Sequence, residues 1–306
     1  MLPPQNDWNA TWALLPPIEV DMNGNIVDHA LERNLRLVME SAAKHPWVIE
    51  AGDRWYPDYM KFVLHQWEMA GRRNPLTGKL MTFEQAMDAS GAYAINAGWN
   101  ETMALYHNWQ IGKPNPKDKK RNRYADEAAS MNASLTGGRW YERAKVHESE
   151  KINDFTLNGK GNLWTSTTDR VMSRLALGTD DSEFAAGLLK AGFAGSYVDP
   201  KTGETVKLNG YERISRAIDR VAIQMGAPNP AAGQARMWIE FFGPEAACGL
   251  PPDDVVAEGL VSINEWTRQQ VRDKIPGIDN VLPQWVSDIL RTRGQKYKVK
   301  PLKLKL

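Results

Sequence analysis

Apolar side chains recur along this chain at the three- and four-residue spacing of helices, and strand-like alternation is confined to one short segment. One helical face is expected between positions 28 and 43, and it consists of Leu31, Leu35, Val38 and Met39. A similar stripe is expected further along, and it consists of Ile214, Ala217, Ile218, Val221 and Met225. The pattern predicts a mostly α-helical protein.

Capping residues mark where several of these helices should begin. Asp28 is the expected N-cap of the first helix. Pro57 suits the first turn of the next helix, because its missing N–H would be unpaired there in any case. Thr82 and Gln85 have the spacing of a capping box, in which each side chain bonds the backbone of the other.

Two segments depart from the helical pattern. Residues 112–138 are rich first in Pro and Lys and then in Ser, Asn and Gly, so we expect a long loop with about one helical turn. Residues 197–208 place two β-prone runs around a Pro-Lys-Thr-Gly turn. They predict one small β-hairpin in an otherwise helical fold.

The chain shows no internal repeat and no clear linker, so we expect a single helical domain over residues 1–306. Its core is expected at about residues 80–245. Helices within 1–79 and 246–306 should pack on that core.

Composition narrows the classes of function. Cys248 is the only cysteine, which excludes an internal disulfide and a cysteine-rich zinc or iron–sulfur site. The five histidines are scattered without metal-ligand spacing, so no metal and no cofactor are expected. Since no apolar run of about 18 residues is present, no membrane span is expected. The cysteine usage suits a reducing compartment, so cytoplasmic residence is the natural expectation.

The charge is nearly balanced, with 38 basic and 37 acidic residues and a net charge of +1. Any DNA binding must therefore come from local basic patches. One lies within residues 113–123, and its expected contacts to the DNA backbone are Lys117, Lys119, Lys120, Arg121 and Arg123. Lysines of the C-terminal tail form a second patch, and the alternative for either is a solvated surface.

Candidate chemistry concentrates in residues 151–178, where a helix leads through a glycine-containing turn into a second helix. Thr167 is the expected cap of this second helix, which should end at Gly178. Asp169 then falls in the first turn, where free N–H groups and the positive end of the dipole favour an anion. A fixed anion suits the cationic transition state of glycosidic cleavage. The alternative is an ordinary acidic residue at a helix start.

The same region resembles the helix-hairpin-helix DNA glycosylase superfamily, to which endonuclease III belongs. Lys151 and Asp169 match the paired lysine and aspartate of that family in order and approximate separation, and Asn158 matches an asparagine in its first helix. Arg170–Leu177 resembles the helix that follows the aspartate. The resemblance implies that Asp169 and Lys151 are the catalytic residues.

A second match lies upstream, in Ala92–Asn100. In the family a polar segment here approaches the DNA, and Asn96 falls where a glutamine often probes the gap left by an extruded base. The ordered blocks, at 84–109, 151–178 and 211–242, also resemble bacteriophage proteins. The resemblance implies a base-binding site, whose expected residues are Tyr93, Asn96, Trp99, Asn100, Asn158 and Thr168.

The segment before Lys151 departs from the family, because Val146–Glu150 contains no glycine. In the family a glycine-rich turn grips a DNA phosphate at this point. The basic run at 113–123 is the expected substitute.

Three functions remain open. The first is a DNA glycosylase that flips a modified base and cleaves its N-glycosidic bond. The second is a phage transferase that places an amine or amino acid on an activated thymine, with Asp169 as the general base. The third is a phage DNA-binding protein without catalysis on the same scaffold, which the missing glycine turn favours.

Overall fold

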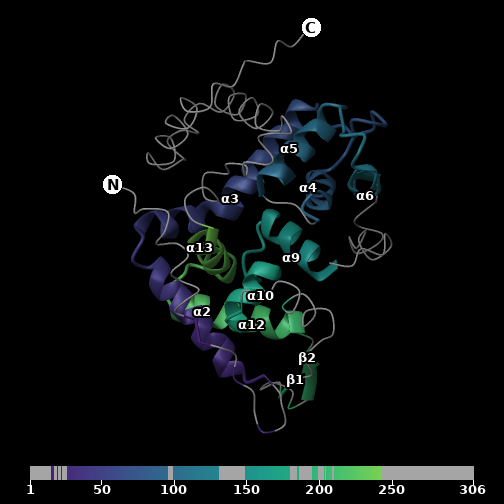
Figure 1. The fold of residues 1–306 in the computed structure, drawn as a ribbon. Helices are drawn as coiled ribbons and strands as arrows, with labels where there is room; N and C mark the ends of the chain where they lie inside the picture. Colours follow the sequence, from purple (N-terminus) through teal and green to yellow (C-terminus); the bar gives the residue numbers. More distant parts are fainter. Residues whose placement is uncertain are drawn as a thin grey trace. The chain divides into compact units, whose positions relative to one another are not determined.

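The computed structural model confirms a mostly helical protein (Figure 1). It describes residues 15–16, 19, 22, 26–95, 99–130, 149–179, 185, 195–198, 203, 205–208 and 210–242. The chain divides into two compact units. Unit 1 contains the described residues of Met1–Tyr56 and Asn162–Gly243, and unit 2 contains those of Pro57–Gly161. The expected single domain over 1–306 stays a prediction.

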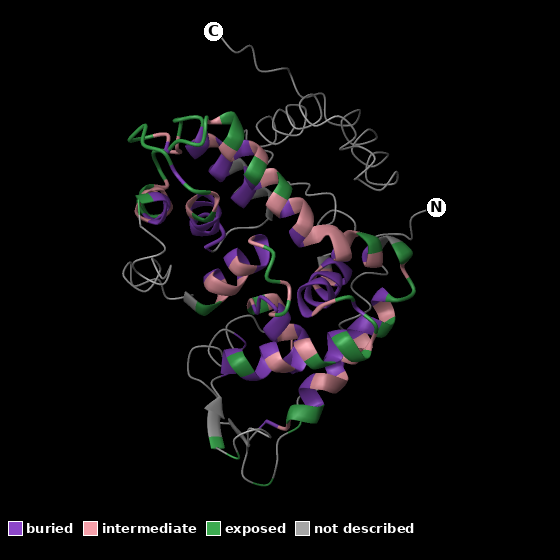
Figure 2. Cartoon of the chain, turned by 180° about the vertical axis from the view of Figure 1, so that it is seen from behind, coloured by how far each residue is buried: buried purple, intermediate pink, exposed green. Residues whose placement is uncertain are grey.

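Unit 1 is built around α2 (Asp28–Ala42), which packs against α10 (Arg170–Leu177), α12 (Gly210–Gln224) and α13 (Pro230–Phe242). Buried and exposed positions alternate along α2 and α12, as amphipathic packing requires, whereas the described residues of α13 are nearly all buried (Figure 2). The stripes expected on α2 and α12 lie in this core, with Met225 partly buried at its edge. The largest core residues of α10 are Met172, Leu175 and Leu177.

Asp28 does not cap α2, contrary to the expectation from the sequence. Val27 occupies the N-cap position and makes no side-chain cap bond. Asp28 is instead the first helical residue, and its Oδ1 lies 2.5 Å from Nη2 of Arg213 on α12. The buried guanidinium needs a carboxylate partner, and this requirement takes Asp28 away from the local cap.

The helix α3 (Pro46–Met69) begins eleven residues before Pro57, so the expected start at Pro57 is wrong. Pro57 lies inside the helix, where it lacks the N–H that would bond the carbonyl one turn earlier. Val48 and Tyr56 are buried upstream of it. Their burial stabilises the first turns of the helix enough to carry it through the proline. The boundary between the two units falls at this residue.

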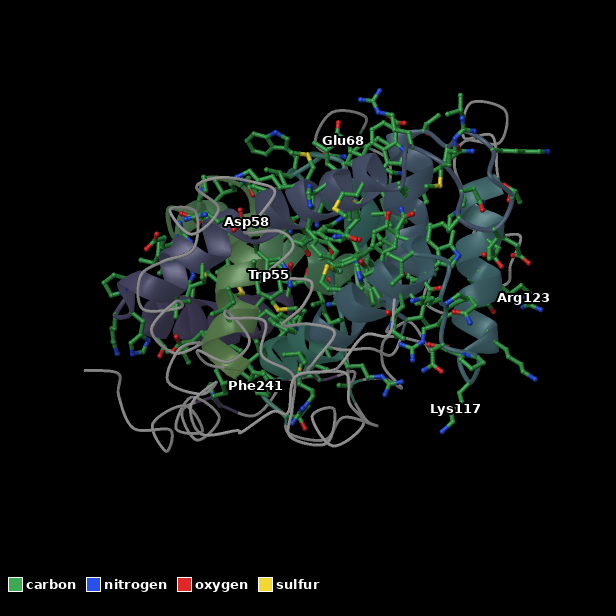
Figure 3. All side chains as sticks on the ribbon, turned by 90° about the horizontal axis from the view of Figure 1, so that it is seen from above. Trp55, Asp58, Glu68, Lys117, Arg123 and Phe241 are labelled. Atoms are coloured by element: carbon green, nitrogen blue, oxygen red, sulfur yellow. The ribbon has the colours of Figure 1, made fainter. Side chains whose placement is uncertain are left out.

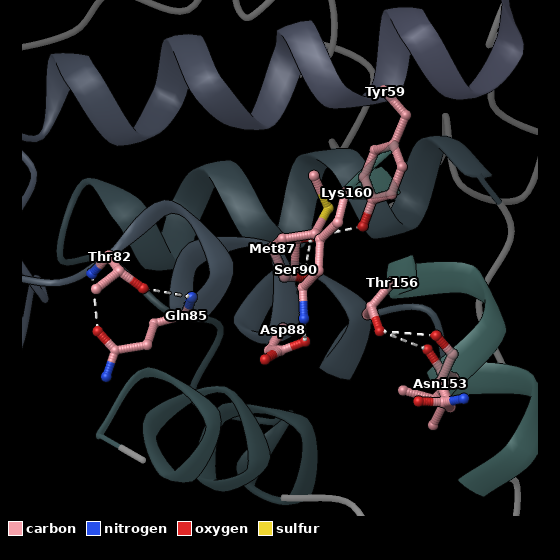
Figure 4. Close-up of polar contacts among 10 residues, drawn as sticks. Tyr59, Thr82, Gln85, Met87, Asp88, Ser90, Asn153, Thr156 and Lys160 are labelled. Carbon is pink, nitrogen blue, oxygen red and sulfur yellow. Dashed lines mark hydrogen bonds and ion pairs between the residues drawn. The ribbon is translucent and has the colours of Figure 1, made fainter. Parts of the chain in front are cut away.

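Unit 2 is built around α4 (Phe83–Ala92), which packs against α5 (Trp99–Gln110), α6 (Lys119–Ser130) and α9 (Ser149–Gly159). The capping box of Thr82 and Gln85 is confirmed, with both reciprocal bonds present (Figure 4). A Cβ added at Gly91 would lie 2.3 Å from Cγ2 of Thr156, so α4 and α9 approach too closely for any side chain there.

A buried ion pair joins α4 to the residue that directly follows α9. Nζ of Lys160 lies 2.5 Å from Oδ1 of Asp88, a residue only 4% exposed (Figure 4). Burial raises the pKa of Asp88, and the charge and hydrogen bond of Lys160 oppose that rise. Beside it, Tyr59 Oη and Ser90 Oγ are 2.5 Å apart.

The expected loop over residues 112–138 is wrong for its central part, because α6 is a helix of 12 residues. Its apolar positions, Tyr124, Ala125, Ala128 and Ala129, are all buried. Alanine has the highest helix propensity, and this stripe outweighs the lysines that made the segment resemble a loop. Residues 131–138 lie outside the described residues.

The N-cap of α10 is Asp169, two residues after the expected Thr167. Its end is confirmed at Gly178, which adopts the left-handed conformation with φ 63°. Beyond α10, β1 (Gly195–Val198) pairs antiparallel with β2 (Thr205–Leu208), with Gly195 opposite Leu208. The helices expected within 246–306 and the basic C-terminal tail lie outside the described residues.

Candidate active site around Asp169

Asp169 is held at the start of α10 by two hydrogen bonds that use both carboxylate oxygens. Oδ1 accepts from the backbone N–H of Met172 at 2.9 Å. Oδ2 accepts from the indole N–H of Trp238 on α13 at 3.1 Å. The residue is half-buried, so the carboxylate is fixed in place without being sealed from its surroundings.

The two bonds do not saturate the group. An ionised carboxylate offers about four acceptor positions, and the N-cap bond and the indole bond use two of them. Both donors are N–H groups that cannot accept a proton, so both bond the carboxylate as an acceptor. The carboxylate therefore lies at the start of α10, where the sequence predicts an acidic side chain.

Trp238 is itself fixed by a partner from α3. The Trp55 and Trp238 rings lie 5.1 Å apart between centroids at 55°, a tilted aromatic pair. Both rings are half-buried. The carboxylate of Asp169 therefore lies beside an indole, and its remaining acceptor positions can in chemical terms accept hydrogen bonds from a ligand.

The segment that leads into Asp169 packs on a polar stripe of α12. Tyr211, Ser215 and Asp219 follow one another at four-residue spacing along that helix. Tyr211 Oη accepts from the backbone N–H of Thr168 at 3.2 Å, and Ser215 Oγ is 3.1 Å from Ser166 Oγ. The expectations drawn from the sequence do not include this stripe, although polar residues at i, i+4 and i+8 on an amphipathic helix indicate one.

Two groups in this network are unusual. Thr168 is 1% exposed, and its Oγ1 has no hydrogen-bond partner in the part of the chain that the structure describes. Burial raises the pKa of Asp219 to about 6, while hydrogen bonding from Ser166 and the charges of Arg220 and Arg216 act in the opposite direction. A carboxyl that titrates near neutral pH can exchange protons under physiological conditions.

Lys151 lies on α9 in unit 2, and its side chain reaches the backbone just after α4. Its Nζ is 3.5 Å from the carbonyl oxygen of Ala94. Thr102 and Arg121 direct donors to the preceding carbonyl, that of Tyr93, at 3.3 and 3.5 Å. Cations stabilise the negative end of a helix, so this geometry gives Lys151 and Arg121 a structural role.

Two other expected base-binding residues are buried in unit 2. Tyr93 is fully buried, and its hydroxyl donates to Oδ1 of Asn122 at 2.9 Å. Burial raises the pKa of that phenol, so it stays protonated. Asn158 is 1% exposed. Asn96 and the side chains of Trp99 and Asn100 lie outside the described residues, and the expected base-binding roles stay predictions.

The basic run is divided by the start of α6. The side chains of Lys117, Lys119, Lys120 and Arg123 are exposed, and Figure 3 shows Lys117 and Arg123 extending away from the ribbon. Two of the arginines have acidic partners: Nε of Arg121 pairs with Oδ2 of Asp118 at 2.8 Å, and Nε of Arg123 lies 3.6 Å from Oε1 of Glu127. The helix dipole disfavours cations at an N-terminus. Lys120 and Arg123 do contact their own helix, because both lie over the ring of Tyr124, at 5.8 and 5.2 Å from its centroid.

Two features are absent from the described residues, a metal-binding cluster and a membrane-spanning helix. Within those ranges, His, Cys, Asp and Glu form no group of three or more that could hold a metal ion. Among the helices that the structure describes, none is both long and apolar enough to cross a membrane. Comparison with protein-family models, with curated proteins and with solved structures finds no match to this chain.

Proposed function

We propose that the chain is a DNA-base-processing enzyme, a glycosylase that hydrolyses the N-glycosidic bond of a modified base extruded from the DNA. The observation that supports it is the half-buried Asp169 carboxylate, held as an acceptor at the start of α10 with two acceptor positions left over. The reaction class comes from the resemblance to the helix-hairpin-helix glycosylases. In this proposal the chain is a bacteriophage member of that group.

The proposed step is a displacement at C1′ of the deoxyribose. As the bond to the base breaks, the base leaves with the electron pair and the sugar becomes cationic. The Asp169 carboxylate stabilises that cation and orients a water molecule. The water oxygen bonds C1′, one proton passes to Asp169, and the departing base takes up a proton from solvent.

Water, not an amine, is the nucleophile in this proposal. A lysine nucleophile attacks through a neutral Nζ, and the Nζ of Lys151 is directed to the carbonyl of Ala94. The reaction therefore ends at an abasic site, without a covalent enzyme intermediate.

A second candidate is a DNA-binding protein without catalysis. The exposed cations at the start of α6 favour it, because they oppose the helix dipole and suit an external polyanion. This surface also serves the glycosylase, so DNA binding alone does not separate the two functions.

Mass spectrometry of the products separates the candidates. The purified protein is incubated with bacteriophage DNA that contains modified thymines, with and without amino acids or simple amines. A glycosylase releases free base, a thymine-modifying transferase gives an altered nucleoside that retains its sugar, and a binding protein changes neither. Free base is the expected product, and its absence overturns the glycosylase.

A further inference from the structure

Asp169 depends on a side chain that lies 69 residues further along the chain. Trp238 Nε1 donates to Oδ2 of Asp169, while the N-cap bond from Met172 engages only Oδ1. A single bond to one oxygen leaves a carboxylate free to rotate about its Cβ–Cγ bond. The indole bond fixes the second oxygen, and with it the direction in which the open acceptor positions point.

The indole is itself anchored through α13. Arg236 donates to Asp53 at 2.7 and 2.8 Å, and Gln234 accepts from the hydroxyl of Tyr56 at 2.8 Å. A Cβ added at Gly52 would lie 2.8 Å from the backbone N of Arg236, so the backbones of α3 and α13 approach closely. These contacts fix the position of α13 against the first part of α3.

Trp55 completes this support from α3. Its ring packs against that of Trp238, with 5.1 Å between the ring centroids. Three consecutive even-numbered positions of α13, at Gln234, Arg236 and Trp238, thus have partners on α3. These contacts hold the indole of Trp238 more firmly than an isolated tryptophan on the surface would be held.

We infer that Trp238 is the positioning residue for Asp169, and that it orients the carboxylate toward the sugar in the reaction proposed above. The inference rests on the proposed function for its catalytic consequence, but the hydrogen bond itself can be tested without any activity. An indole N–H donates and never accepts, so it holds the carboxylate as an acceptor throughout the step.

Trp238→Phe removes the donor and keeps an aromatic ring, and Trp55→Phe is the matched control, because it shrinks the partner ring and leaves the donor. Loss of a hydrogen bond to a charged group should slow base release by roughly ten- to a hundredfold in Trp238→Phe at saturating DNA, with KM within about twofold. Trp55→Phe should stay within about threefold of the wild type. Added to Asp169→Asn, Trp238→Phe should cause no further loss, because both act through one carboxylate.

The function-independent measurement follows the indole N–H resonance of Trp238 by NMR, assigned by its loss in Trp238→Phe. It should move in Asp169→Asn. A matched pair in unit 2 provides the control, since Trp109 Nε1 donates to Oδ1 of Asp126 at 2.8 Å. Asp126→Asn should move the Trp109 resonance and leave that of Trp238 unchanged.

A Trp238 resonance that does not respond to Asp169→Asn overturns the inference, whatever the activity. Equal slowing by Trp238→Phe and Trp55→Phe also overturns it, because the effect would then be packing. If the wild-type protein releases no base, the proposed function fails, and the resonance experiment still decides whether Trp238 orients Asp169.

Discussion

The carboxylate of Asp169 joins two helices, because its Oδ1 caps α10 through Met172 while its Oδ2 accepts from Trp238 on α13. One side chain therefore has a structural role and a proposed catalytic role. Experiments on Asp169 must separate the two, and the chemistry of the N-cap allows this.

Asp169→Asn should keep the N-cap of α10, because the amide oxygen can accept from Met172 as the carboxylate does. Its NH2 group meets the indole N–H of Trp238, so we expect a small loss of stability, less than that caused by alanine. Asp169→Ala removes the cap and the acceptor for Trp238, and it should lower the free energy of unfolding by about 0.5–2 kcal/mol. Urea denaturation of the two variants measures the difference. If Asn and Ala cost the same, the carboxylate does not cap α10 in solution.

Thr168→Val should separate stability from activity in another way. The Thr168 hydroxyl is buried without a partner among the described residues, so replacing it with a methyl group should preserve or raise the melting temperature. If the hydroxyl serves a bound substrate, base release should fall in the same variant. Ser173→Ala is the comparison, because the Ser173 hydroxyl donates to the backbone carbonyl of Asp169 at 2.8 Å. Loss of that hydrogen bond should lower the melting temperature. A destabilised Thr168→Val with unchanged activity contradicts this assignment.

Asp219 should make stability depend on pH. Its folded pKa of about 6 is above its ordinary value of 3.8, so the folded state binds the proton more tightly. The associated stability is complete below pH 3.8 and is lost as the pH rises through 6. At about 1.4 kcal/mol per pKa unit, the full loss approaches about 3 kcal/mol.

Asp219→Asn keeps the size of the side chain and removes its titration. The free energy of unfolding of this variant, measured by urea titration between pH 4 and 8, should therefore fall less with rising pH than that of the wild type. Parallel curves for the two proteins would show that Asp219 titrates normally.

The ion pair of Asp88 and Lys160 should be costly to break from one side. Lys160→Met leaves a buried carboxylate without its cation, and loss of one partner of a buried pair typically costs about 3–5 kcal/mol. Adding Asp88→Leu should recover much of that loss, since the double variant buries no charge. Chemical denaturation of both single variants and the double variant gives the coupling, and strictly additive effects would contradict the pairing.

The basic start of α6 should control the salt dependence of DNA binding. Each duplex phosphate contact contributes about 0.9 to the slope of log K against log salt, so Lys119→Gln with Lys120→Gln should reduce that slope by up to about 2. Lys79→Gln, at another exposed lysine of unit 2, is the matched control. A slope that is the same in all these proteins would exclude α6 from the DNA contact.

Local signals in the sequence predicted local structure well. The capping box at Thr82 and the glycine end of α10 depend on a few adjacent residues, and both are confirmed. The expectations for Asp28 and Pro57 are wrong for the opposite reason. Distant partners, the buried Arg213 and the packing upstream of Pro57, override their local preferences.

The candidate site shows the same division. Asp169 was identified from the sequence because a carboxylate at a helix start is a local feature. Its bond to Trp238 joins residues 69 positions apart, and no spacing rule connects them. Lys151 and Tyr93 matched a family pattern, but burial and helix-end contacts, which a pattern does not encode, give them structural partners.

The proposed role of Asp169 is tested most directly by the rate of base release from the wild type and Asp169→Asn under single-turnover conditions, with folding checked by denaturation. The wild type should give free base and abasic sites, and the variant should be at least about a hundredfold slower. A folded Asp169→Asn protein that releases base at the wild-type rate would contradict it.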